Sequence, residues 1–117
     1  MMQEARWTAE VAIMNRHFPM FAAFKTENGS VGFFGPIRGR RTGREYTVIV
    51  KVRAQNNPEK EPAVYIHPCI GLGHWQFDEV NHDPNGRLNF ERRWVPARCT
   101  FANCVLVAIQ FLEDFDR

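Results

Sequence analysis

Apolar residues recur at helical spacing near both ends of the chain. In Glu4–His17 they stand three or four positions apart and Pro19 closes the segment, which predicts an amphipathic helix. A second segment of this kind covers residues 100–115 and starts at Thr100, whose hydroxyl suits a helix N-cap. The apolar positions are Trp7, Val11, Met14 and Phe18 in the first helix, and Phe101, Val105, Ala108, Ile109, Leu112 and Phe115 in the second.

Four short segments between these helices have the features of strands. The clearest is Glu45–Arg53, in which every second residue is apolar from Tyr46 onward, as in a half-buried strand. Residues 20–26 and 31–37 are joined by a strong turn sequence, and residues 63–66 supply a fourth strand. We therefore expect an α+β fold, in which a four-stranded antiparallel meander carries the first helix on its concave side and the C-terminal helix against or beside it.

In residues 69–86 the apolar residues recur at neither helical spacing nor the alternate spacing of a strand. The segment contains glycines, two aromatic residues and the turn sequence Pro84-Asn85-Gly86. Loops of this length inside a compact domain are usually functional. We expect a long ordered loop that carries part of a functional site.

Length and composition favour one domain spanning residues 1–117, since 44% apolar content supplies a single modest core. No apolar run approaches the roughly 20 residues of a membrane span, and the N-terminus lacks the pattern of a signal peptide. The three cysteines form no Cys-x-x-Cys pair, so neither a disulfide framework nor a zinc knuckle is indicated. We expect a soluble, cytoplasmic protein.

Positive charge is dense only at RGRRTGR, which runs from Arg38 to Arg44. This cluster alternates with glycine and threonine, and it lacks the interleaved aromatic residues of a single-strand binding platform. We therefore interpret it as a solvated hairpin loop rather than a nucleic-acid site.

Several motifs beyond Phe18 resemble the ubiquitin-conjugating enzyme fold in their order and spacing. They are Y-x-V-x-V at residues 46–50, P-E-K-E-P-A-V-Y-I at 58–66, H-x-x-x-G-R-L-N-F at 82–90 and W-x-P at 94–96, followed by the closing helix. The pattern is similar in particular to bacterial ubiquitin-conjugating-like proteins found beside activating-enzyme-like and deconjugating genes, including antiphage defence operons.

The resemblance implies a degenerate catalytic site. It places Asn89 at the position of the family's thioester cysteine, and a carboxamide cannot form a thioester. The His-Pro-Asn element of eukaryotic members, whose Asn stabilises the oxyanion, is scrambled around Asn81 and His82. The chain thus resembles the catalytically inactive variants, which bind a ubiquitin-like modifier or an activating or conjugating protein. The candidate binding residues are His82, Arg87, Asn89 and Trp94.

Other interpretations stay open. The nucleophile of an active transferase could have moved to Cys69 or Cys99, or the chain could be a structural module that shares only the architecture. Cys99 and Cys104 also suit inert buried thiols, and Asn89 suits an ordinary turn. No cofactor or metal is expected, because the spacing of the possible ligands matches no zinc pattern. Those possible ligands are His67, Cys69, His74 and His82.

Overall fold

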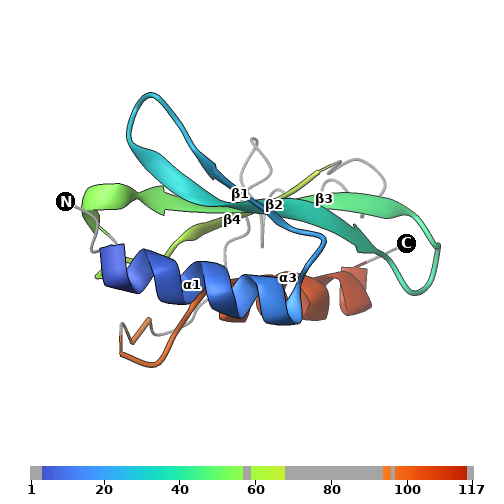
Figure 1. The fold of residues 1–117 in the computed structure, drawn as a ribbon. Coiled ribbons are helices and arrows are strands. Elements are labelled where there is room, and N and C mark those ends of the chain that lie inside the picture. The colour runs from blue at the N-terminus through green and yellow to red at the C-terminus, as the bar shows by residue number, and fades with distance from the viewer. Residues whose placement is uncertain (1–3, 57–58, 68–93, 96, 116–117) are drawn as a thin grey trace.

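The computed structural model describes residues 4–56, 59–67, 94–95 and 97–115. Its elements are α1 (Glu4–His17), β1 (Ala22–Lys25), β2 (Ser30–Arg38), β3 (Glu45–Arg53), the 3-10 turn η1 (Ala54–Asn56), β4 (Ala63–His67) and α3 (Phe101–Phe115). The strands form one antiparallel sheet in the order β1-β2-β3-β4. Both helices cover the same face of this sheet (Figure 1). The predicted α+β class, meander and pair of terminal helices are confirmed.

The helix ends follow from local chemistry. The helix α1 ends at His17 as predicted, since Pro19 cannot continue the ladder of hydrogen bonds. At the start of α3, the Thr100 hydroxyl accepts the Asn103 amide at 3.3 Å, and the Asn103 side chain accepts the Thr100 amide at 2.7 Å. In the described part of the chain, neither helix is long and apolar enough to cross a lipid bilayer.

Two hairpin turns set the register of the meander. Gly29 and Gly43 have φ of 86° and 71°, a conformation that favours glycine, and each lies in a predicted turn. The turns are closed by backbone hydrogen bonds from Thr26 N to Ser30 O and from Gly39 N to Arg44 O, both at 2.8 Å. The basic segment is thus the β2–β3 hairpin loop.

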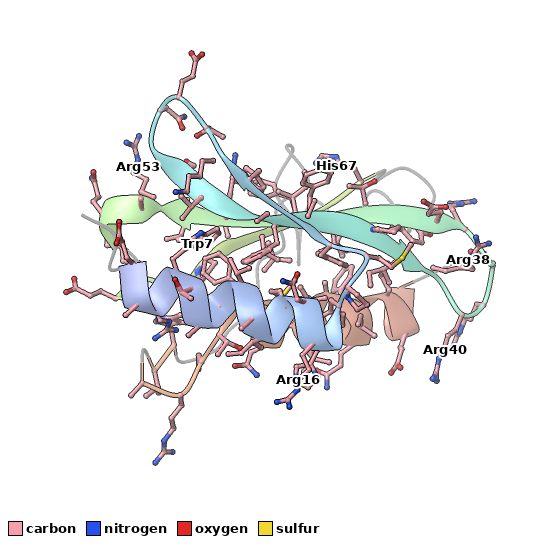
Figure 2. All side chains as sticks on the ribbon, in the orientation of Figure 1. Trp7, Arg16, Arg38, Arg40, Arg53 and His67 are labelled. Atoms are coloured by element: carbon pink, nitrogen blue, oxygen red, sulfur yellow. The ribbon has the colours of Figure 1, made fainter. Side chains whose placement is uncertain are left out.

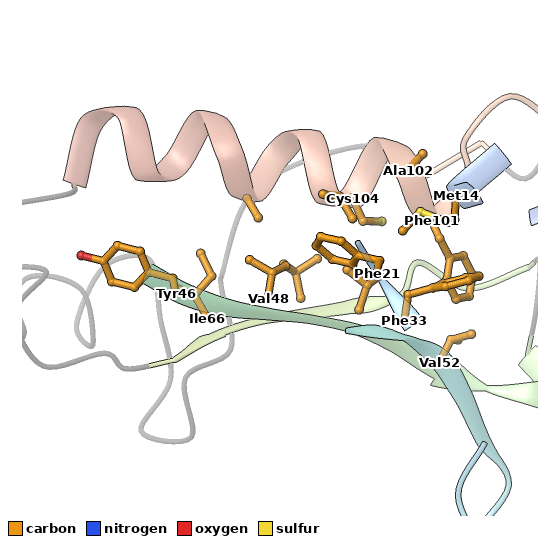
Figure 3. Packing of buried hydrophobic residues seen from close by; sticks show 14 of the residues in the cluster. Met14, Phe21, Phe33, Tyr46, Val48, Val52, Ile66, Phe101, Ala102 and Cys104 are labelled. Carbon is orange, nitrogen blue, oxygen red and sulfur yellow. The ribbon is translucent and has the colours of Figure 1, made fainter. Parts of the chain in front are cut away.

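The core lies between the sheet and the helices (Figure 3). On β3 the buried residues alternate as predicted, and Tyr46, Val48 and Val50 are fully buried. The helix α3 packs against β2, β3 and β4 and beside α1, so the predicted packing of the C-terminal helix is confirmed. Other buried apolar residues are Met14, Phe21, Val31, Phe33, Val52, Val64, Ile66, Phe101, Ala102, Cys104, Val105, Ala108 and Leu112.

Aromatic contacts join three elements of this core. Trp7 of α1 stacks on Phe33 of β2 with ring centroids 5.1 Å apart, and Phe101 of α3 meets Phe33 edge to face at 5.3 Å. On the same face of the sheet, Gly35 leaves room for the Phe21 ring, because a Cβ at position 35 would lie 2.5 Å from it. The first helix is therefore fixed to the sheet by ring packing.

Candidate functional site

Most residues that the resemblance assigns to the site lie outside the described residues. These are Asn81, His82, Arg87 and Asn89, as well as the alternative nucleophile Cys69 and the possible metal ligand His74. The exposed His67 at the end of β4 is described. Within the described ranges, no group of three His, Cys, Asp or Glu side chains is placed to hold a metal ion.

Trp94 stands in the short segment that leads into α3. Its side chain is half-buried and packs against the hydrophobic core. After it, the Val95 carbonyl accepts the amides of Arg98 and Cys99 at 2.9 and 2.8 Å. This turn fixes the backbone, so Trp94 anchors the segment to the core and keeps part of its surface accessible.

The two described cysteines are not exposed thiols. Cys104 is 3% exposed on the inner side of α3, and Cys99 is half-buried. The Cys99 sulfur accepts the Val95 amide at 3.4 Å. Because a nucleophilic thiol needs access to its substrate, neither position has the environment of a reactive cysteine.

A buried carboxylate ties this segment to α1. Glu10 is fully buried, and its Oε2 lies 2.9 Å from Nε of Arg6. Its Oε1 accepts the Phe101 amide at 3.0 Å, at the start of α3, where a negative charge complements the helix dipole. Arg6 also donates from Nη2 to the Cys99 carbonyl at 2.6 Å. We call these four residues the helix clamp.

The sheet face opposite the helices, which we call the outer face, presents large side chains that alternate with the core residues. In register across β2, β3 and β4 stand Phe34, Ile49 and Tyr65. Phe24 of β1 meets Phe34 edge to face, with centroids 6.0 Å apart. Lys51 places its ammonium 5.1 Å from the centre of the Tyr65 ring. Phe34 is 45% exposed, and the others are half-buried.

The outer face contains a hollow of about 360 Å³ beside Tyr65. Its polar lining consists of Ser30, Lys51, Arg53, Lys60 and Glu61. Figure 2 shows Arg53 on the side of the sheet away from the helices. The hollow therefore combines three cationic side chains, one carboxylate and an aromatic edge.

A second groove, of about 620 Å³, lies between the first turns of α1 and the β1–β2 hairpin. Trp7 and Val31 supply apolar surface to it, and Lys25, Thr8 and Ser30 supply polar groups. Figure 2 shows Trp7 between α1 and the sheet.

Comparisons with protein-family models, with curated proteins and with solved structures found no match.

Two features of the described residues were missed by the sequence interpretation. The outer face depends on strand register, which brings Phe34 and Tyr65 into one row although 31 positions separate them in the chain. The second feature, the buried Glu10, was not considered in the sequence interpretation. A signal was present, because Glu10 stands three residues after Trp7 and four before Met14, on the apolar side of the helix.

Proposed function

We propose that the chain is a non-catalytic ubiquitin-conjugating-like domain that binds a ubiquitin-like modifier or a protein of its conjugation pathway. The observation that carries the proposal is Asn89, which occupies the position that the sequence resemblance assigns to the thioester cysteine. The helix–meander–helix order supports the architecture that the resemblance implies. An α+β arrangement of this kind is compatible with many functions, so the proposal rests on the motif and not on the fold alone.

The chemistry of the described residues supports a binding role. Thioester formation needs a thiolate that can reach an activated carboxyl carbon, and a carboxamide has no comparable nucleophile at neutral pH. Cys104 is buried, and the half-buried Cys99 sulfur accepts a backbone hydrogen bond. A nucleophile relocated to Cys99 is therefore disfavoured, and Cys69 is the alternative that an experiment must address.

A charging assay tests the proposal. The protein is mixed with a cognate activating enzyme, ATP and modifier, and the products are separated with and without reductant. We expect no reducible adduct, and a direct complex with the modifier or the activating enzyme should be measurable by titration calorimetry. An adduct abolished by Cys69→Ser or Cys99→Ser would establish a relocated nucleophile and overturn the non-catalytic proposal. Absence of both adduct and complex would favour a structural module.

Restoring the family residue tests whether the site is degraded in more than one element. We expect Asn89→Cys to fold and to lose about 1 kcal/mol of stability through lost hydrogen bonds of the carboxamide. It should gain little thioester, since the sequence around Asn81 and His82 still lacks the oxyanion element. Asn89→Ser is the matched control for the change in size. Efficient charging of Asn89→Cys would show that only the nucleophile was lost.

We further infer a bacterial, cytoplasmic setting, with antiphage defence as the process in which the protein acts. The bacterial branch of the resemblance supports the source and the process. The two described cysteines are thiols and not members of a disulfide, which is consistent with a reducing compartment. Fractionation of cells that express the chain tests the cytoplasmic setting. Phage challenge of cells with and without the chain tests the role in defence.

A further inference from the structure

The outer face offers a stacking surface built from three strands. Phe34 is the most exposed of its aromatic residues, at 45% of its surface, and Phe24 supports it from β1. Tyr65 stands in the same row on β4, two strands away, which corresponds to about 10 Å at the usual spacing of strands. Ile49 fills the position between them. Two rings thus stand in one row across the sheet, with Ile49 between them.

Positive charge on the outer face lies beside Tyr65. Lys51, Arg53 and Lys60 line the hollow beside Tyr65, and Glu61 is the one carboxylate among its lining residues in the described part of the chain. The hairpin loop of residues 38–44 lies at the other end of β2 and β3, where Arg40 is 3.7 Å from Glu113 of α3 on the helix-covered side (Figure 2) and Arg38 is 4.0 Å from Glu45. The cations that a ligand on the outer face would meet are therefore Lys51, Arg53 and Lys60.

We propose that the outer face binds single-stranded nucleic acid. A base stacks on the exposed Phe34 ring, Tyr65 supplies a second ring next to Lys51, and phosphates lie against Lys51, Arg53 and Lys60 in the hollow. Stacking on aromatic rings tolerates every base, and cations along the path neutralise phosphates without reading sequence. This function is separate from binding of a modifier and does not depend on it.

The combination of rings and cations favours nucleic acid over an acidic protein segment. An acidic segment would use the cations, but it has no flat π surface to match the exposed Phe34 ring, whereas an unpaired base has one. A duplex keeps its bases stacked inside, so it would use the charges alone.

Fluorescence anisotropy with a labelled oligo-dT of about 12 nucleotides tests the proposal. We expect saturable binding with a micromolar Kd at low salt and a marked loss of affinity between about 50 and about 200 mM salt. The same sequence as a duplex should bind several-fold more weakly.

Matched variants separate the outer face from the rest of the surface. Phe34→Ala should weaken binding about tenfold, the loss expected for one stacked base. Leu106→Ala is its control, because Leu106 is 48% exposed on α3 and should leave affinity unchanged. Lys51→Gln should reduce the salt slope by about one, while Arg16→Gln on α1, which lies away from the sheet in Figure 2, should not. Circular dichroism checks that each variant is folded. If Phe34→Ala does not fold, Lys51→Gln still tests the proposal.

Three results would overturn the proposal. The first is no binding of the oligonucleotide at about 100 μM protein and low salt. The second is equal binding by the Phe34→Ala and Leu106→Ala variants with unchanged salt slope for Lys51→Gln. The third is displacement of the oligonucleotide by poly-L-glutamate as effectively as by unlabelled oligo-dT, with no effect of Phe34→Ala, which would identify the face as a site for acidic protein.

Discussion

The two faces of the sheet are built from the same strands and differ in almost every physical property. On the helix-covered face, Phe33 and its neighbours are buried and form one contiguous core. On the outer face, Phe34 is half exposed, although it is the next residue along the same strand. Successive side chains of a strand point to opposite sides, so one position in the sequence separates a core residue from a surface residue.

This difference separates stability from recognition. Apolar groups on the helix-covered face are withdrawn from water, and each contributes to folding through area and packing. Apolar groups on the outer face remain partly exposed to water, and a bound ligand can still bury them. Substitutions on the first face should therefore change the free energy of unfolding, and substitutions on the second should change binding.

The largest expected effect comes from Phe33. Phe33→Ala should lower the free energy of unfolding by about 4 kcal/mol, because it removes a ring that contacts both Trp7 and Phe101. Phe34→Ala should cost less than about 1 kcal/mol. Urea denaturation of both variants measures the contrast. Similar losses for the two would show that the outer face is not a separate surface, and Phe33→Leu supplies a milder probe if Phe33→Ala is too unstable to study.

The next largest effect should come from Glu10, the buried carboxylate of the helix clamp. Glu10→Ala should cost about 3 kcal/mol, because it leaves Arg6 and the Phe101 amide without their buried acceptor. Glu10→Gln keeps an oxygen for the Phe101 amide but loses the charge, so it should cost roughly half as much. Equilibrium unfolding checks both, and a loss below 1 kcal/mol for Glu10→Ala would contradict the role of the helix clamp.

Gly35 tests how closely the helix-covered face is packed. Gly35→Ala should destabilise the fold by about 2 kcal/mol, since the added methyl meets the Phe21 ring. Combining it with Phe21→Leu should recover part of that loss, which a double-mutant cycle detects. Strictly additive losses would mean that the Phe21 ring does not limit the space at position 35.

The smallest effect should come from the cation on the outer face. Lys51→Met removes the ammonium that lies over the Tyr65 ring and should cost about 0.5 kcal/mol, since such contacts are weak where water has access. The measurement is again urea denaturation, with Lys60→Met as the control for loss of a nearby positive charge. A loss comparable to that of Glu10→Ala would remove the distinction between the two faces.

Elements with a strong local period were predictable from the sequence. The bounds of α1 and β3 agree with prediction. In α1 a stripe of apolar residues ends at Pro19, and in β3 apolar residues alternate strictly, so each pattern fits one type of element. The strand β1 is shorter than predicted and begins at Ala22. Phe21 turns into the core instead of extending the strand, and Met20 is 74% exposed, outcomes that composition alone does not determine.

The candidate surfaces were less predictable because they depend on contacts between distant segments. The row of Phe34, Ile49 and Tyr65 exists only once the register of three strands is fixed. The contact of Glu10 with Phe101 joins two helices, and no helical period specifies which backbone amide a carboxylate will meet. The residues around Asn89 lie outside the described part of the chain, so the assignment of the thioester position remains a prediction from the sequence.

The helix clamp also bears on the order in which the chain folds. Each strand of the meander pairs with the strand next to it along the chain, and such local contacts form early. The hydrogen bond between Glu10 and Phe101 instead joins residues that are 91 positions apart. The chain must therefore lose the entropy of closing a long loop before this contact can compensate for it. We expect the meander to form in the transition state and the clamp to close afterwards. Glu10→Ala should then accelerate unfolding and leave the folding rate nearly unchanged, so the clamp would determine how long a folded molecule persists.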